Sequence, residues 1–355
     1  MNYTIKNASA LGMEITLGVT KDQLKSFLIS LNWLNKGEEI IGLEKPGEGN
    51  MNMVLRVVTN QRQLIIKQSK NFVNKYPTIP APIDRIVTEN QFYDLSGEVS
   101  GLNEYLPKKL GFSSKNYIML LQDLGYGSDF TYLYKKGNEI GQLELECVLD
   151  FLSKLHKKDF SEEFIRKYPN NMELRKLNHQ HLFVFPFLTD NGFDLDSIQP
   201  GLQELSIKYK TDLNLKAILL KLGKIYLSQG RALLHGDFFP GSWLKVEKTF
   251  KVIDPEFSFF GLAEFDLGIM AAHMRMAHQP EWVLYRIYKY YQENVIDENL
   301  ARQFEGVEIL RRIIGLAQLP LDLTIEGRND LLKHAYNLVV TNQRQQRMLV
   351  HGSLD

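Results

Sequence analysis

The 355-residue sequence has one cysteine, Cys147, and so cannot form an internal disulfide. This excludes a small secreted fold held together by disulfides. The sequence also has no uninterrupted apolar run near the roughly 18 residues that a membrane-spanning helix requires. Its beginning lacks the basic and apolar regions of a signal peptide. We therefore expect a cytoplasmic protein without a membrane partner.

The sequence has no excess charge of either sign, with 42 Lys and Arg residues against 42 Asp and Glu residues. Dedicated nucleic-acid binders usually carry a basic excess, so we expect no nucleic-acid partner. A balanced total still allows a local basic pocket for a small anion. The hydrophobic fraction of 44% is that of an ordinary globular protein, and the length suggests two domains.

The pattern of the first part of the chain indicates strands, and that of the second part indicates helices. We place the boundary near Asp123, giving a strand-rich lobe with an N-terminal helix at 1–123 and a mainly helical lobe at 124–355. A capping box at Thr20 predicts the first helix. The other elements expected in this lobe are strands at 53–58, 63–68 and 116–122, a loop at 76–82 and a helix at 84–95.

The second part is expected to contain helices at 144–157 and 213–229. Between them, residues 168–211 are rich in Asn, Asp and Gly, and we expect them to be irregular. Short strands and loops are expected near Leu233, and helices again from Phe265.

The most informative stretch is His235-Gly-Asp237, which is followed five positions later by Ser242 and then by Asp254-Pro-Glu256. Phosphoryl transfer needs one carboxylate to accept the proton of an attacking hydroxyl and oxygen ligands to hold Mg²⁺. Asp237 suits the first role and Asp254 the second. If the segment is extended, Glu256 faces the same side as Asp254. Each acid alone would more often be a turn residue, but the combination favours catalysis.

A lysine and a glycine-rich loop upstream strengthen this interpretation. Lys67 lies in an apolar strand, where the alternative is a solvated edge lysine. In kinases such a lysine holds the phosphates and pairs with a helix glutamate. Glu89, 22 residues on, is the expected partner, and Glu98 is the second choice. The loop Gly47-Glu-Gly-Asn-Met-Asn52 would let backbone amides approach phosphates.

With these residues the chain resembles the aminoglycoside phosphotransferase and choline kinase superfamily and, within it, the methylthioribose kinase family. The glycine-rich loop is similar to that family's Gly-Asp-Gly-Asn-Leu-Asn. His235-Gly-Asp-Phe-Phe-Pro-Gly-Ser242 is similar to His-Gly-Asp-Leu-His-Thr-Gly-Ser, and Ile253-Asp-Pro-Glu-Phe257 to Ile-Asp-Pro-Glu-Phe. The resemblance implies an α+β, protein-kinase-like fold with a nucleotide-binding lobe at 1–123 and a catalytic, acceptor-binding lobe at 124–355. It also implies ATP and Mg²⁺ as cofactors, and 5-methylthioribose or a related sugar as acceptor.

The resemblance also assigns roles to individual residues. Asp237 is the implied catalytic base. The implied nucleotide-binding residues are Gly47, Gly49, Asn50, Asn52, Lys67, Glu89 and, at the hinge that holds adenine, Gln122 and Leu124. The implied metal ligands are Asp254, Glu256 and Ser242. Arg311 and Arg312 are the implied substrate residues, with a solvated helix face as the alternative.

The departures from the family concern the acceptor more than the reaction. Gln122 stands where the family usually has Glu, Phe239 replaces the second His of its motif, and 262–264 replace a Pro-Met-Gly turn. Residues 171–201 look unlike the family. An amino alcohol, homoserine, another sugar or an aminoglycoside therefore stays open as acceptor, as does a nucleotide-binding pseudokinase. A homodimer is also left open.

Overall fold

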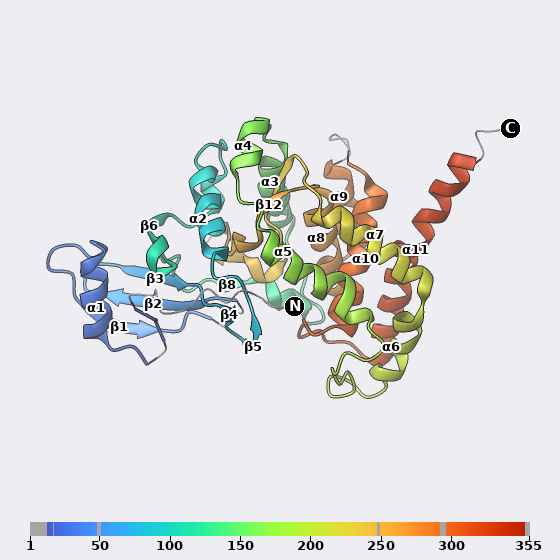
Figure 1. Ribbon diagram of the computed structural model, residues 1–355, viewed down its shortest axis with the longest axis horizontal. Helices are drawn as coiled ribbons and strands as arrows, with labels where there is room; N and C mark the ends of the chain where they lie inside the picture. Colours follow the sequence, from blue (N-terminus) through green and yellow to red (C-terminus); the bar gives the residue numbers. More distant parts are fainter. Residues whose placement is uncertain (1–12, 17, 48–50, 247–248, 292–295, 352–355) are drawn as a thin grey trace. The chain divides into compact units, whose positions relative to one another are not determined.

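The computed structural model describes residues 13–16, 18–47, 51–246, 249–291 and 296–351, and it divides into two compact units (Figure 1). The first unit contains Met1–Ser128 together with Leu244–Ser258. The second contains Asp129–Trp243 and Phe259–Asp355. The short segment 244–258 therefore belongs to the first unit, although the residues before and after it in the sequence belong to the second.

The first unit is built on a five-stranded sheet in which all neighbouring strands are antiparallel. Its strand order is β1 (Ile40–Glu44), β2 (Met53–Thr59), β3 (Gln63–Gln68), β7 (Ile118–Gln122) and β6 (Lys109–Ser113). The strands expected at 53–58, 63–68 and 116–122 are therefore present.

Helix α1 (Lys21–Ser30) covers one face of this sheet. Thr20 and Gln23 form the expected capping box at its start. Leu24 and Leu28 of α1 share a buried core with alternate strand residues, among them Leu64 and Ile66. Because side chains alternate along a strand, Lys67 of β3 is directed to the opposite face.

Helix α2 (Arg85–Ser96) is the other helix that matters for the site. It packs against the single turn Pro255–Phe257 and against β7. The prediction of a loop at 76–82 is partly wrong, because β5 (Tyr76–Pro80) pairs with β4 (Phe72–Val73) in a small hairpin. Prolines are tolerated there because each strand of a two-stranded ribbon is an edge. The unit is completed by β10 (Trp243–Val246) and β11 (Thr249–Val252), and β8 (Ser128–Asp129) lies at the unit boundary.

The second unit is mainly helical, as expected. Its helices are α3 (Gln142–Lys157), α4 (Glu162–Lys167), α5 (Met172–His179), α6 (Leu202–Thr211), α7 (Leu213–Leu227), α8 (Glu264–Met276), α9 (Glu281–Tyr291), α10 (Glu298–Ile314) and α11 (Ile325–His351). Strands β9 (Ala232–Leu234) and β12 (Phe259–Gly261) form an antiparallel pair. The prediction that 168–211 is irregular is partly wrong, because this stretch contains α5 and α6, whose buried residues pack into the helical core despite the polar sequence. Residues 188–201 contain no helix or strand, as expected.

Helix α10 lies at the centre of this unit, between α8 and α11 (Figure 1). Almost every residue from Phe304 to Ile314 is buried. The helices α8 and α10 approach closely at Gly268, where an added Cβ would lie 2.6 Å from the carbonyl oxygen of Ala301. Among the described residues, no helix is both long and apolar enough to cross a membrane.

Candidate active site

Lys67 is the centre of a buried ion-pair cluster in the first unit. Its Nζ lies 2.8 Å from Glu89 Oε1 on α2 and 2.7 Å from Asp254 Oδ1. The side chain of Lys67 is 3% exposed, which excludes a solvated edge lysine. Glu89 is the partner, as the sequence predicts, while Glu98 lies exposed beyond the end of α2.

The electrostatics of this cluster keep the lysine charged. Burial alone would lower the pKa of Lys67, but the carboxylates of Asp254 and Glu89 outweigh burial and raise that pKa well above its usual value. Burial raises the pKa of Glu89, against the opposing effect of Lys67. In protein kinases a charged strand lysine paired with a helix glutamate contacts the nucleotide phosphates, and a separate aspartate binds Mg²⁺.

Arg85, the first residue of α2, is a central residue of this unit that the sequence reasoning missed. Its Nε lies 3.0 Å from Asn52 Oδ1 and 3.1 Å from Glu256 Oε2, and its side chain is fully buried. Asn52 also donates from Nδ2 to Glu256 Oε2 at 2.9 Å. A signal for this role was present, because a cation in the first turn of a helix opposes the helix dipole and needs a compensating partner.

Asp254 and Glu256 do not lie in an extended segment, so the condition under which both acids face the same side is not met. Asp254 has φ 63°, in the left-handed region that Asp tolerates better than most residues, and Pro255–Phe257 forms a single helical turn. The turn separates the two acids. Asp254 remains half-exposed beside Lys67, with 47% of its side chain accessible, while Glu256 is buried against Arg85 and Asn52.

The glycine-rich loop borders a cavity of about 310 Å³. Gly47 and Asn52 line it, together with Val54 of β2 and Lys70. Gly49 and Asn50 lie outside the described residues. Val54 was missed by the sequence reasoning, although the spacing from Gly47 matches the Gly-x-Gly-x-x-Gly-x-Val kinase signature with Asn52 at the third glycine.

The expected hinge residues are Gln122, at the end of β7, and Leu124, in the segment that follows, which is held by Arg56 of β2. Arg56 Nε lies 2.6 Å from Asp123 Oδ2, and Nη2 donates to Asp123 Oδ1 at 3.1 Å and to the carbonyl of Gly125 at 2.8 Å. A bidentate pair of this kind fixes orientation as well as distance. The backbone on either side of Leu124 is therefore well defined, as an adenine site requires.

Asp237 lies in the second unit, on a loop whose backbone is held by Asp266 of α8. Asp266 accepts hydrogen bonds from the backbone N–H of His235 at 2.7 Å and of Gly236 at 2.9 Å. Gly236 has φ 83°, a conformation that suits glycine. Asp237 therefore projects from a fixed turn with 29% of its side chain exposed. The sequence analysis gave Asp266 no role.

Ser242 is buried close to the same loop. Its Oγ donates to the backbone carbonyl of Asp237 at 3.0 Å, and the residue is 3% exposed. This bond closes the turn that carries Asp237, and the hydroxyl oxygen keeps acceptor capacity for a metal ion. Its expected role as a metal ligand stays a prediction.

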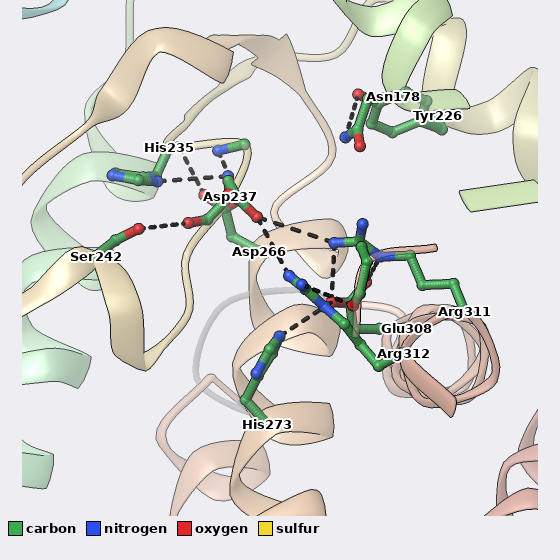
Figure 2. Close-up of polar contacts among 12 residues, drawn as sticks. Asn178, Tyr226, His235, Asp237, Ser242, Asp266, His273, Glu308, Arg311 and Arg312 are labelled. Carbon is green, nitrogen blue, oxygen red and sulfur yellow. Dashed lines mark hydrogen bonds and ion pairs between the residues drawn. The ribbon is translucent and has the colours of Figure 1, made fainter. Parts of the chain in front are cut away.

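Arg311 and Arg312 of α10 face Asp237 in the same unit. Figure 2 shows both guanidinium groups converging on its carboxylate, with each Nη2 atom 4.0 Å from Oδ1. Their side chains are 7% and 9% exposed, so the alternative of a solvated helix face is wrong. Two buried cations beside a carboxylate can bind the oxygen atoms of a small polar molecule.

The donor set in the first unit suits Mg²⁺. Across the described part of the chain, no three His, Cys, Asp or Glu side chains gather into a preformed metal site. Mg²⁺ does not need one, because proteins usually hold it with one or two carboxylates plus substrate phosphates. The exposed carboxylate of Asp254 beside Lys67 fits that mode.

Comparison with known proteins agrees with this geometry. Residues 186–298 match the model of the phosphotransferase enzyme family. The chain is 26% identical to a methylthioribose kinase of Exiguobacterium sibiricum over 69% of this chain, in a match that spans 64% of that relative's length. It is 26% identical to a methylthioribose kinase of Geobacillus thermodenitrificans over 90% of this chain and 91% of the relative.

Among solved structures, a spectinomycin phosphotransferase in complex with ADP and spectinomycin superimposes with a TM-score of 0.53. The sequences are 13% identical, and the match covers 92% of this chain and 99% of the other. This likeness confirms the α+β, protein-kinase-like fold class. The comparisons together confirm the predicted resemblance: the chain contains a phosphotransferase-family region and is similar to methylthioribose kinases along most of its length.

Proposed function

We propose that this chain is an ATP-dependent small-molecule kinase that transfers the γ-phosphate to a hydroxyl of 5-methylthioribose or a related sugar. The observation that carries the proposal is the buried Lys67, with Glu89 and Asp254 both within 2.8 Å of its ammonium group. The similarity to methylthioribose kinases supports the choice of acceptor.

In this proposal the first unit holds the nucleotide. Gly47 and Asn52 border the cavity that would receive phosphates, and Gln122 and Leu124 would hold adenine through their backbone groups. Lys67 would bind the phosphates from its place beside Glu89. Gly49 and Asn50, in the same loop, keep the same expected role.

The first unit would also hold the metal ion. Asp254 is the best-placed ligand because its carboxylate is half-exposed. Glu256, already bound to Arg85 and Asn52, would add negative charge or a second ligand oxygen. Ser242, which belongs to the second unit, stays a candidate ligand on the resemblance alone. When bound, Mg²⁺ neutralises charge on the phosphates.

The second unit supplies the groups for the acceptor. Asp237 would orient the acceptor hydroxyl and accept its proton as the oxygen forms a bond to the γ-phosphorus, while the bond to the β–γ bridging oxygen breaks and ADP leaves. Arg311 and Arg312 would bind other oxygen atoms of the acceptor. Positioning and charge stabilisation supply most of the acceleration in such reactions.

The test is ADP release from ATP and Mg²⁺ in the presence of 5-methylthioribose, other sugars, amino alcohols, homoserine and aminoglycosides. We expect turnover with methylthioribose above the other acceptors. Asp237→Asn should lower kcat by about 10²–10⁴-fold with little change in ATP affinity. Absence of turnover with every acceptor, combined with intact ATP binding, would support the pseudokinase instead.

A further inference from the structure

Glu308 of α10 is a fully buried carboxylate to which the proposed reaction assigns no role. It lies one turn before the arginine pair and accepts hydrogen bonds from both arginines. Arg311 Nε and Nη2 donate to its two oxygens, the latter at 2.9 Å, and Arg312 Nε donates to Oε1 at 2.7 Å. Burial alone would raise the pKa of Glu308, but Arg311 and Arg312 hold that pKa well below its usual value, so the group is ionised.

A histidine and a tyrosine extend this network away from the arginines. His273 Nε2 lies 3.0 Å from Glu308 Oε1, and His273 Nδ1 lies 2.5 Å from the hydroxyl of Tyr134. Burial lowers the pKa of His273 to about 4, so the imidazole is neutral near pH 7. Because an ionised carboxylate only accepts, the proton must be on Nε2, and the Tyr134 hydroxyl therefore donates to Nδ1.

Phe239 completes the surroundings of the arginine pair. Its ring centre lies 5.2 Å from the Arg312 guanidinium carbon and 5.1 Å from the centre of the His273 ring. Phe239 stands where the similar family has the second histidine of its motif. The imidazole next to position 239 is that of His273 on α8. The phenyl ring of Phe239 limits the orientations that the Arg312 side chain can adopt.

These contacts determine which N–H groups of the two guanidiniums remain available to bind a ligand. Glu308 occupies both Nε atoms and one hydrogen of the Arg311 Nη2, and the Nη1 of Arg312 donates to the carbonyl of Ala317 at 3.2 Å. Each Nη2 lies 4.0 Å from Asp237 Oδ1, which is longer than a hydrogen bond. The Nη2 atoms are thus directed at the catalytic carboxylate without being bonded to it (Figure 2).

We propose that Glu308, held in place by His273 and Tyr134, is a positioning residue that directs both guanidiniums toward acceptor oxygens beside Asp237. The inference rests on the proposed kinase function and deepens it. With Glu308 and Asp237 balancing Arg311 and Arg312, the cluster is electrically neutral before the acceptor binds. The acceptor class that fits is a small polyhydroxylated molecule, whose several oxygens can each accept from a guanidinium.

The experiment compares Tyr134→Phe and Glu308→Gln with a matched control, Tyr288→Phe. Tyr288 likewise has a buried hydroxyl that supports a buried glutamate of α10, but it donates directly to that glutamate, Glu305, at 2.6 Å. Glu305 is paired with Arg275 rather than with the arginine pair. For each protein we would measure KM for 5-methylthioribose, KM for ATP, kcat and the melting temperature.

We expect Tyr134→Phe to raise the acceptor KM by about 3–10-fold and Glu308→Gln to lower kcat/KM for the acceptor at least about 100-fold, both with an unchanged KM for ATP. Tyr288→Phe should lower the melting temperature comparably to Tyr134→Phe and leave both KM values unchanged. If Glu308→Gln does not fold, Tyr134→Phe decides. An acceptor KM in Tyr134→Phe equal to that of Tyr288→Phe would overturn the inference. Lack of turnover in the unaltered protein would instead overturn the proposed function.

Discussion

Replacing Arg85 with methionine should destabilise the first unit strongly. Methionine keeps an unbranched apolar stem and removes the guanidinium group. In the structure that group contacts Glu256 Oε2 at 3.1 Å and donates to Asn52 Oδ1 at 3.0 Å. It also donates to the backbone carbonyls of Lys70 at 2.6 Å, Pro82 at 2.8 Å and Met51 at 2.7 Å. All of these bonds are lost together in Arg85→Met.

The expected loss of stability follows from the groups that the substitution leaves unpaired. Glu256 would stay in a site where its side chain is 5% exposed, with its ion-pair partner gone. Breaking a buried ion pair by removing one partner costs about 3–5 kcal/mol. The whole free energy of unfolding of a domain is about 5–15 kcal/mol, so this change removes a large share of it.

Urea unfolding followed by far-ultraviolet circular dichroism measures the effect. Lys25→Met is the control, because Lys25 pairs with Glu39 at the surface of the same unit and its loss should cost at most about 1 kcal/mol. Adding Glu256→Gln to Arg85→Met should restore part of the loss, since no unpaired charge then remains. A loss in Arg85→Met no larger than that of Lys25→Met would refute the reasoning.

Three further changes give clear expectations. Lys67→Met should lower turnover by about 10²-fold and weaken ATP binding, because Glu89 and Asp254 lose their shared cation. Steady-state kinetics and nucleotide titration measure the two effects, and an unchanged ATP affinity would contradict the prediction. The pKa of His273 is about 4 in the folded protein and 6.5 ordinarily, so the unfolded chain binds an extra proton as the pH falls below 6.5. The free energy of unfolding should therefore fall by about 2 kcal/mol when the pH is lowered from about 8 to about 5. That dependence should be absent in His273→Asn urea titrations, and an equal dependence in both proteins would argue against a neutral buried imidazole. Gly268→Ala should lower the free energy of unfolding by about 1–3 kcal/mol, because the new Cβ would lie 2.6 Å from the Ala301 carbonyl oxygen. An unchanged melting temperature would show that α8 and α10 can separate freely.

The sequence predicted the local structure around Lys67 because its signals are short-range. Alternating apolar residues in β2 and β3 determine which side chains face α1, and the helix containing Glu89 begins where the pattern indicates. The Lys67–Glu89 contact follows from these elements with no further information.

The sequence reasoning failed where a role depends on distant partners. Glu308 and Asp266 each look like an ordinary helix acid, and Arg85 like a helix cation. Asp266 and Arg85 matter through atoms 30 or more positions away, such as the backbone N–H of Gly236 for Asp266. Glu308 contacts the nearby arginine pair, but His273, which holds it in place, is 35 positions away. The turn at Asp254 was missed for a related reason: a left-handed residue before proline is decided by its buried surroundings rather than by local preference.

The return of residues 244–258 to the first unit has a consequence for biosynthesis. When residue 128 leaves the ribosome, Arg85 still lacks Glu256, and Lys67 has Glu89 but still lacks Asp254. At usual rates of synthesis the missing segment follows only after about 10 s. A chain fragment that stops at the unit boundary should therefore be poorly folded, and supplying 244–258 as a separate peptide should help it fold.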